Sequence, residues 1–122
     1  YEFRAGNLRD VALEDASFDA VLLGHVLHSE GRERSLVLLR RCLQALRPGG
    51  KVVIAEMVPD PDRRTDSYGV LFGVNMLMLT EAGEVFTAPE LEGLLQEAGF
   101  EHWVWMTVPF PYPVLVASGP EE

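Results

Sequence analysis

Lysine and cysteine are almost absent from this chain of 122 residues. Lys51 is the only lysine, and 19 acidic residues against 10 basic ones give a formal net charge of -9. An acidic surface repels phosphates and anionic headgroups, so we expect neither nucleic acid nor a membrane as partner. Cys42 is the only cysteine, which excludes an internal disulfide and a cysteine metal cluster. A reducing compartment, the cytoplasm, is therefore expected.

Several sequence signatures are also missing. No apolar run is long enough to cross a bilayer, and no signal peptide opens the chain. The sequence contains no G-x-G-x-x-G motif, no P-loop and no G-x-S-x-G turn that would present a serine nucleophile. The chain begins at Tyr1 in a strand-like segment, without methionine, so we expect it to be part of something longer.

The first half of the chain has the pattern of a parallel α/β unit. A short strand is predicted at 1–6, and continuous apolar runs at 18–24 and 51–57 are typical of parallel strands covered on both faces. Residues 33–47 are predicted to form the helix between them, which the Pro-Gly-Gly at 48–50 would end. The leucines expected on its apolar face are Leu36, Leu39, Leu43 and Leu46. This order predicts a right-handed crossover between neighbouring parallel strands.

The second half is predicted to add two helices and a strand pair. Residues 65–79 are apolar and too long for a strand. Thr87–Glu90 has capping-box spacing and predicts a helix that ends at Gly99. Its inward residues would be Leu91, Leu94, Leu95 and Ala98. Residues 102–109 and 113–118 are predicted to form antiparallel strands joined by a proline-rich turn.

Two groups that can carry protons follow the ends of the two predicted parallel strands. His28 lies just past the first strand, and Glu56 lies at the end of the second. Ligands of open parallel sheets bind outside the carboxyl ends of the strands, and neighbouring strands lie about 4.8 Å apart. The two side chains could therefore meet, and a histidine oriented by a carboxylate can act as a general base. Taken singly, each residue favours a structural role: the histidine as a helix cap or solvent-exposed group, and the glutamate as a turn acceptor or salt-bridge partner. Their positions at matched strand ends make the functional role about as strong a hypothesis.

Metal binding is the competing use of the histidines. A zinc site needs three or four converging ligands. His25 and His28 supply two if they are locally helical, and His102 lies far along the chain. We therefore expect no metal site.

Five motifs, in order, carry a resemblance to a known family: AGNL, LLGHVLHSEG, LRPGGKVVIAEMV, NMLMLTEAGEVFT and LLQEAGF. The chain resembles the C-terminal part of class I S-adenosylmethionine-dependent methyltransferases, specifically the small-molecule O-methyltransferases that include caffeate, hydroxyindole and polyketide enzymes. The resemblance implies an α/β fold: a Rossmann-like sheet with crossover helices and a C-terminal antiparallel strand pair. Residues 1–122 would be the C-terminal part of one catalytic domain, without its upstream glycine-rich loop and N-terminal region.

The resemblance also implies roles for individual residues in methyl transfer from S-adenosylmethionine to a hydroxyl of a small, aromatic acceptor. His28 falls at the position of the catalytic base, and Glu56 falls at the carboxylate that flanks it. The implied cofactor contacts are Asn7 and Leu8 at the adenine, with Gly24 and His25 at the strand end. The implied acceptor-binding residues are Phe72, Asn75 and Met76. His25 otherwise packs at the edge of the cleft. The complete protein would be a homodimer, and this chain alone would bind the cofactor poorly.

Five residues depart from the family pattern. Asn7 replaces an aspartate, Gly24 replaces a lysine, and Ser29-Glu30 replaces Asp-Trp. Val85 stands where a second glutamate would flank the base, unless Glu84 serves after a shift of one residue. Two alternatives therefore stay open. The first is a truncated or degenerate module that acts by association through the apolar residues 68–79, and the second is an N- or C-methyltransferase of the same fold.

Overall fold

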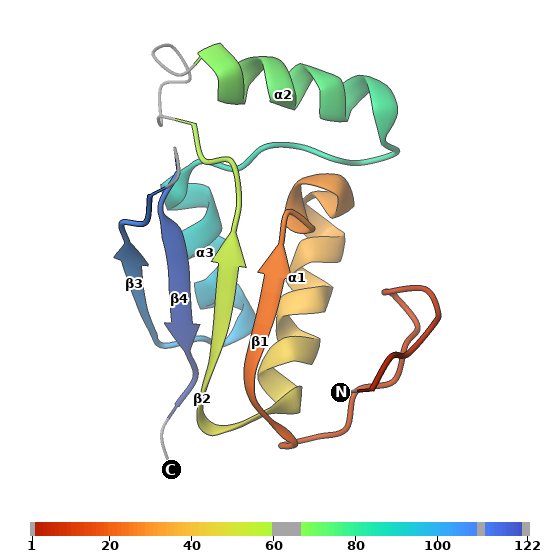
Figure 1. Ribbon diagram of the computed structural model, residues 1–122, viewed down its shortest axis with the longest axis vertical. Coiled ribbons are helices and arrows are strands. Elements are labelled where there is room, and N and C mark those ends of the chain that lie inside the picture. The colour runs from red at the N-terminus through yellow and green to blue at the C-terminus, as the bar shows by residue number, and fades with distance from the viewer. Residues whose placement is uncertain (1, 60–66, 110–111, 121–122) are drawn as a thin grey trace.

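The structure of the protein, a computed structural model, describes residues 2–59, 67–109 and 112–120. These residues form one mixed sheet with the strand order β1-β2-β4-β3, together with three helices (Figure 1). The elements are β1 (Phe18–Gly24), α1 (Leu27–Ala45), β2 (Leu46–Ala55), α2 (Ser67–Leu79), α3 (Ala88–Ala98), β3 (His102–Met106) and β4 (Val114–Ser118). The expected α/β class, with its parallel crossover and its antiparallel C-terminal pair, is confirmed.

The strand register sets which residues lie at the same edge of the sheet. β1 and β2 run parallel, with Leu23 opposite Ile54 and Gly24 opposite Ala55. β4 pairs antiparallel with both β2 and β3. The carboxyl ends of β1 and β2 therefore finish side by side, and α2 lies across this end of the sheet (Figure 1).

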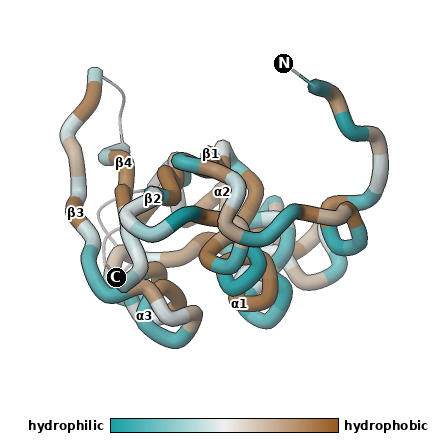
Figure 2. The backbone as a smooth tube through the Cα atoms, turned by 90° about the horizontal axis from the view of Figure 1, so that it is seen from below, coloured by the Kyte–Doolittle hydropathy of each residue, from teal (hydrophilic) through white to brown (hydrophobic). Residues whose placement is uncertain are grey.

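The hydrophobic core lies between the sheet and one layer of helices. Seen from below, α1 and α3 lie on the same side of the strands (Figure 2). Leu39 of α1, Leu94 of α3 and Ile54 of β2 are among the buried residues that meet there. The expected cover on both faces is wrong for the described residues, because α1 and α3 share one face. On β1, Leu22 is accordingly 72% exposed.

The start of α3 follows the predicted capping box. The Glu90 carboxylate accepts hydrogen bonds from the backbone N–H and the hydroxyl of Thr87, at 3.3 and 2.8 Å. Pro89 lies in the first turn, where its missing N–H costs nothing. Gly99 ends the helix with a φ of 108°, which a residue with a side chain rarely adopts. All four residues expected on its inner face are buried.

Several element boundaries differ from the predictions; β3, for example, ends at Met106 rather than at residue 109. Residues 2–6 form no strand, because the described part of the chain offers them no strand to pair with. α1 begins at Leu27, six residues earlier than expected. The sequence pattern missed this start because the first turn is polar and contains no leucine repeat. The helix ends at Ala45, and β2 already includes Pro48. The buried face of α1 runs through Leu38, Leu39, Cys42 and Ala45; of the four predicted leucines, Leu36 and Leu43 are only half-buried.

Candidate active site

A tight turn after β1 places His28 in the first turn of α1. β1 ends at Gly24, and His25 adopts the left-handed conformation with a φ of 54°. The backbone N–H of His25 donates a hydrogen bond of 2.9 Å to the carbonyl oxygen of Ala55, the last residue of β2. This bond ties the turn to the neighbouring strand, so that the helix starts directly above the carboxyl ends of β1 and β2.

Glu56 caps this helix from the neighbouring strand. Its Oε1 atom accepts hydrogen bonds from the backbone N–H groups of Leu27, at 3.0 Å, and His28, at 3.4 Å. Val26 at the N-cap position makes no side-chain capping bond, so Glu56 takes over that function. A carboxylate at a helix N-terminus is also favoured by the helix dipole, and Glu56 is only 4% exposed.

The second oxygen of Glu56 holds the imidazole of His28. Oε2 lies 2.7 Å from Nδ1 of His28. Because an ionised carboxylate only accepts hydrogen bonds, the ring hydrogen belongs on Nδ1, and Nε2 keeps the lone pair that can take a proton. Phe72 of α2 meets the His28 ring edge-on, with 4.9 Å between ring centroids and an interplanar angle of 82°. The expected meeting of His28 and Glu56 is present, and their catalytic roles stay a prediction.

The loop between α2 and α3 packs against the same helical turn. α1 is interrupted at Gly31, which has a φ of 78°, and a Cβ atom there would lie 2.1 Å from the carbonyl oxygen of Ala82. The backbone N–H of Glu84 donates a hydrogen bond of 2.9 Å to the carbonyl oxygen of His28. A Cβ atom at Gly83 would lie 2.5 Å from that oxygen. Close approach of this loop therefore requires glycine at both positions.

The second flanking carboxylate of the family pattern is not provided at the expected position. Val85 is buried, and a Cβ atom at Gly73 of α2 would lie 3.7 Å from its side chain. Glu84 contacts His28 through its backbone N–H. Among the described residues, Glu56 supplies the carboxylate that bonds to the His28 ring.

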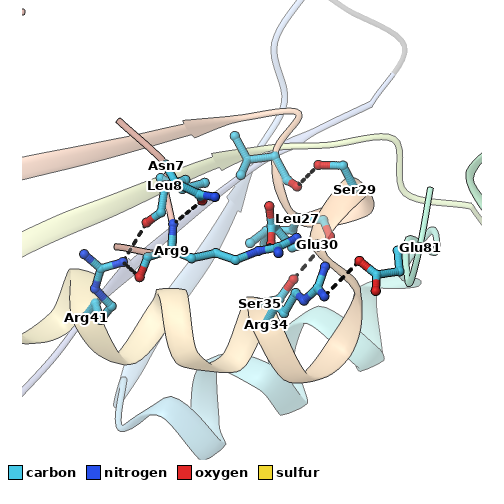
Figure 3. A network of polar contacts seen from close by, with 11 residues as sticks. Asn7, Leu8, Arg9, Leu27, Ser29, Glu30, Arg34, Ser35, Arg41 and Glu81 are labelled. Carbon is cyan, nitrogen blue, oxygen red and sulfur yellow. Dashed lines mark hydrogen bonds and ion pairs between the residues drawn. The ribbon is translucent and has the colours of Figure 1, made fainter. Parts of the chain in front are cut away.

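The N-terminal segment is fastened to the outer side of α1. The Arg41 guanidinium donates hydrogen bonds to the carbonyl oxygens of Leu8, at 2.7 Å, and Arg9, at 3.2 Å (Figure 3). It donates a further hydrogen bond to the carbonyl oxygen of Val11. The Arg9 side chain reaches Glu30, two residues after His28, at 3.4 Å. Between this segment and α1 lies a groove of about 280 Å³. Its lining comprises Leu8, Arg9, Glu30, Glu33, Arg34, Val37, Leu38 and Arg41.

The structure thus gathers only some of the predicted site residues around His28. Glu56 and Phe72 contact His28, and the His25 ring lies 5.9 Å from the His28 ring between centroids. Gly24 follows on the strand end, where an added Cβ atom would meet nothing within 4 Å. Leu8 lines the groove, and the Oδ1 atom of Asn7 accepts from the backbone N–H of Arg9 at 3.0 Å. Farther along α2, Asn75 is exposed and Met76 is half-buried.

Sequence reasoning missed Arg41, Gly31 and Gly83. Arg41 lies beyond the expected apolar face of α1, and no local signal marks its contact with residues 8–11, about 30 positions earlier. Gly31 immediately follows the His-Ser-Glu sequence, and a glycine inside a helix is a usable sign of a kink or a close approach. Among the described helices, none is long and apolar enough to cross a membrane.

Known proteins that resemble this chain are O-methyltransferases. The profile of the O-methyltransferase domain matches residues 1–101. The tetracenomycin polyketide synthesis 8-O-methyl transferase TcmO of Streptomyces glaucescens is 37% identical over 82 residues, which are 67% of this chain and 24% of that protein. The (R,S)-reticuline 7-O-methyltransferase of Papaver somniferum is 32% identical over 116 residues, which are 92% of this chain and 32% of that protein. The chain thus spans a third or less of the length of these relatives.

Solved structures give the same result. The structure of human N-acetylserotonin methyltransferase in complex with SAM superposes with a TM-score of 0.85 and 28% identity, covering 98% of this chain and 34% of that one. This likeness confirms the Rossmann-like methyltransferase fold and the resemblance to small-molecule O-methyltransferases. A module acting only by association is not favoured by these relatives.

Proposed function

The chain belongs to the O-methyltransferase family, and on that premise we propose that it is the C-terminal part of a catalytic domain that methylates a hydroxyl group of a small, aromatic acceptor, with S-adenosylmethionine as the methyl donor. The observation that carries the proposal is the 2.7 Å contact between His28 and Glu56 at the carboxyl ends of two parallel strands. A homodimeric complete protein remains a prediction from the family resemblance.

His28 is the proposed general base. Glu56 keeps the ring hydrogen on Nδ1, so that Nε2 can take the proton of the acceptor hydroxyl. The ring then becomes an imidazolium, and the carboxylate 2.7 Å away stabilises its positive charge. Because Glu56 is almost completely buried, water screens this interaction less than it would at the surface. A positioned general base typically contributes about 10² to 10⁴ in rate.

The groove beside α1 has the composition that an adenine needs. When bound, S-adenosylmethionine supplies an electrophilic methyl group on a sulfonium sulfur. Leu8, Val37 and Leu38 offer apolar contacts for the face of a purine, while Arg9 and Glu30 place hydrogen-bonding groups at its edge. The residues of this chain therefore fit the adenine end of the donor.

The strand end offers further room for the donor. Gly24 has open space where a side chain would be, which allows a ligand to approach the backbone closely. Gly24 and His25 are retained as proposed contacts on this basis. Asn7 is a weaker candidate for a cofactor contact, because its Oδ1 atom already accepts a hydrogen bond from the backbone N–H of Arg9.

The apolar helix α2 is the proposed wall for the acceptor. Phe72 already places an aromatic ring against His28, and α2 lies across the strand ends (Figure 1). An aromatic acceptor could pack against this helix while its hydroxyl reaches His28. Met76 and Asn75 on α2 are proposed to extend the wall. Relatives named for reticuline, a flavonoid and a hydroxy-naphthoate support an aromatic acceptor for this chain.

The test is the substitution His28→Ala in the complete protein that contains this chain. We expect kcat for methyl transfer to a panel of phenols to fall by about 10²–10⁴-fold. The dissociation constant of S-adenosylhomocysteine, measured by calorimetry, should change less than about threefold. His102→Ala is the matched control, because His102 is exposed on β3 and lies outside the site. Wild-type turnover in His28→Ala would refute the base, and the absence of S-adenosylhomocysteine binding by the wild type would refute the donor.

A further inference from the structure

We propose that His25, His28 and Glu56 together form a binding site for a divalent transition-metal ion of the Zn²⁺ and Co²⁺ type. One ligand atom from each residue lies within 4.8 Å of the other two. Two ligands on a tetrahedral Zn²⁺ ion, with bonds of about 2.1 Å, lie about 3.4 Å apart. Closing the three groups around one ion therefore requires shifts of about an ångström.

The sequence alone predicted no metal site, because only the three histidines were considered as ligands. The third ligand comes from the neighbouring strand. His25 N–H is bonded to the Ala55 carbonyl oxygen at 2.9 Å, and Ala55 directly precedes Glu56. The parallel pairing of β1 and β2 thus brings together three ligands that are separated by up to 31 positions in the chain.

The backbone of His25 supports a functional role for this side chain. Its φ of 54° lies in the left-handed region, which only a few per cent of residues with a side chain adopt, although histidine does so more often than most. Residues held in such conformations concentrate at catalytic and binding sites, where the surrounding structure maintains them. Here the hydrogen bond to Ala55 maintains the turn, and the turn brings the His25 ring to within 5.9 Å of the His28 ring.

The three residues combine a buried part with an exposed one. Glu56 and His28 are buried, and Oε1 of Glu56 is held by the backbone N–H groups of Leu27 and His28, an arrangement that orients the carboxylate as an outer-shell partner would. His25 is exposed, so an ion can reach this residue from solvent. Two imidazoles and one carboxylate favour Zn²⁺, Co²⁺, Ni²⁺ or Cu²⁺ over Mg²⁺ and Ca²⁺, which prefer oxygen ligands.

Metal binding would inhibit the base, a consequence that rests on the proposed function. An ion held by all three residues takes Nδ1 of His28, because this is the nitrogen that faces Glu56. The contact between Nδ1 and Glu56 is then replaced by the metal bond, and the ring hydrogen moves to Nε2. His28 therefore loses the ability to accept a proton at Nε2.

The experiment uses Co²⁺ as an optical probe on the complete protein, prepared without metal. We expect about one equivalent of Co²⁺ to give visible absorption bands that Zn²⁺ abolishes by displacement. His25→Asn removes one imidazole while keeping a residue that tolerates the left-handed turn, and His28→Asn removes the other. Each should weaken Co²⁺ binding at least tenfold, whereas His102→Asn, at an exposed position on β3, should bind as the wild type does. Circular dichroism of each variant verifies its fold.

Two readouts separate this site from the proposed function. Equal Co²⁺ affinity in the wild type, His25→Asn and His28→Asn would overturn the metal site even if methyl transfer requires His28. Co²⁺ binding that depends on both histidines would support the site even if His28→Ala left turnover intact. If the metal site exists and turnover requires His28, Zn²⁺ should inhibit turnover. The His25→Asn variant should then need at least tenfold more Zn²⁺ for half-inhibition. Equal Zn²⁺ sensitivity in both proteins would show that inhibition arises elsewhere.

Discussion

On one side, His28 is held by Glu56 and by the loop between α2 and α3. Glu56 caps the helix and holds the ring, and the loop at Ala82 and Glu84 packs against the same turn. On the other side, α2 presents apolar side chains outward, and Leu77 is 77% exposed. The orientation of the proposed base is thus determined locally, whereas the proposed acceptor wall is a helix whose apolar surface is largely open. The exposed large residues of α2 are Leu71, Val74, Leu77, Met78 and Leu79.

The largest expected effect on the fixed side comes from Glu56→Gln. The glutamine can still cap Leu27 through its carbonyl oxygen, but its amide donates to Nδ1 of His28 and moves the ring hydrogen to Nε2. We expect kcat to fall by about 10²–10⁴-fold with little change in stability. Glu56→Ala should in addition lose about 1–3 kcal/mol in urea unfolding, because the helix N–H group is left buried without a partner. Normal turnover by Glu56→Gln would show that His28 does not need the Glu56 carboxylate to act as a base.

Gly31→Ala tests the packing of the loop against the first turn of α1. The added methyl group would lie 2.1 Å from the Ala82 carbonyl oxygen, at a φ of 78°. We expect a loss of about 2–4 kcal/mol, measured by chemical unfolding. Gly93→Ala in α3 is the matched control, because an added methyl group there meets nothing within 4 Å. It should be neutral or stabilising by up to about 1 kcal/mol. Equal effects would show that the loop adapts to the methyl group.

Substitutions of Leu94 in the core and Leu77 on the exposed helix α2 test the difference between the two regions. Leu94 of α3 is 0% exposed, and Leu94→Ala should cost about 2–5 kcal/mol in unfolding free energy. Leu77→Ala on α2 should change it by less than about 0.5 kcal/mol, because little of that side chain is buried among the described residues. A large loss at Leu77 in the complete protein would mean that another segment covers α2, and the contrast between the two regions would disappear.

The smallest effect concerns Cys42 on the buried face of α1. Burial raises the pKa of its thiol to about 11, above the value of about 9 for an exposed cysteine. Because the folded state holds this proton more tightly, stability should be unaffected below pH 9 and should fall as the pH rises from 9 to 11. At pH 8, a thiol reagent should react slowly with native protein and rapidly in denaturant. Fast native labelling would show that α1 opens readily.

The features that local sequence determines were the ones predicted correctly. Thr87 and Glu90 lie within one helical turn of each other, so their spacing alone indicates a capping box. The apolar runs of β1 and β2, with a helix between them, predict a parallel pair and the meeting of His28 with Glu56 at one edge. Each of these inferences needs only short-range patterns and the general rules of parallel sheets.

The features that depend on distant partners could not be predicted in this way. The start of α1 is stabilised by Glu56, 29 residues after Leu27, and its polar first turn shows no apolar period. The kink at Gly31 exists because residue 82 approaches it, about 50 positions later. Residues 2–6 have the composition of a strand, but a strand forms only where another one offers hydrogen bonds.

The double role of Glu56 also affects how the protein tolerates change over time. A chain that loses this carboxylate loses the cap of α1 together with the partner of its histidine, so it folds less well before it ever meets an acceptor. Cellular quality control, which removes poorly folded chains, would then eliminate most variants at position 56 whatever reaction the complete protein catalyses. Selection for folding alone would preserve a charge that the proposed chemistry needs, even in lineages whose substrate has changed.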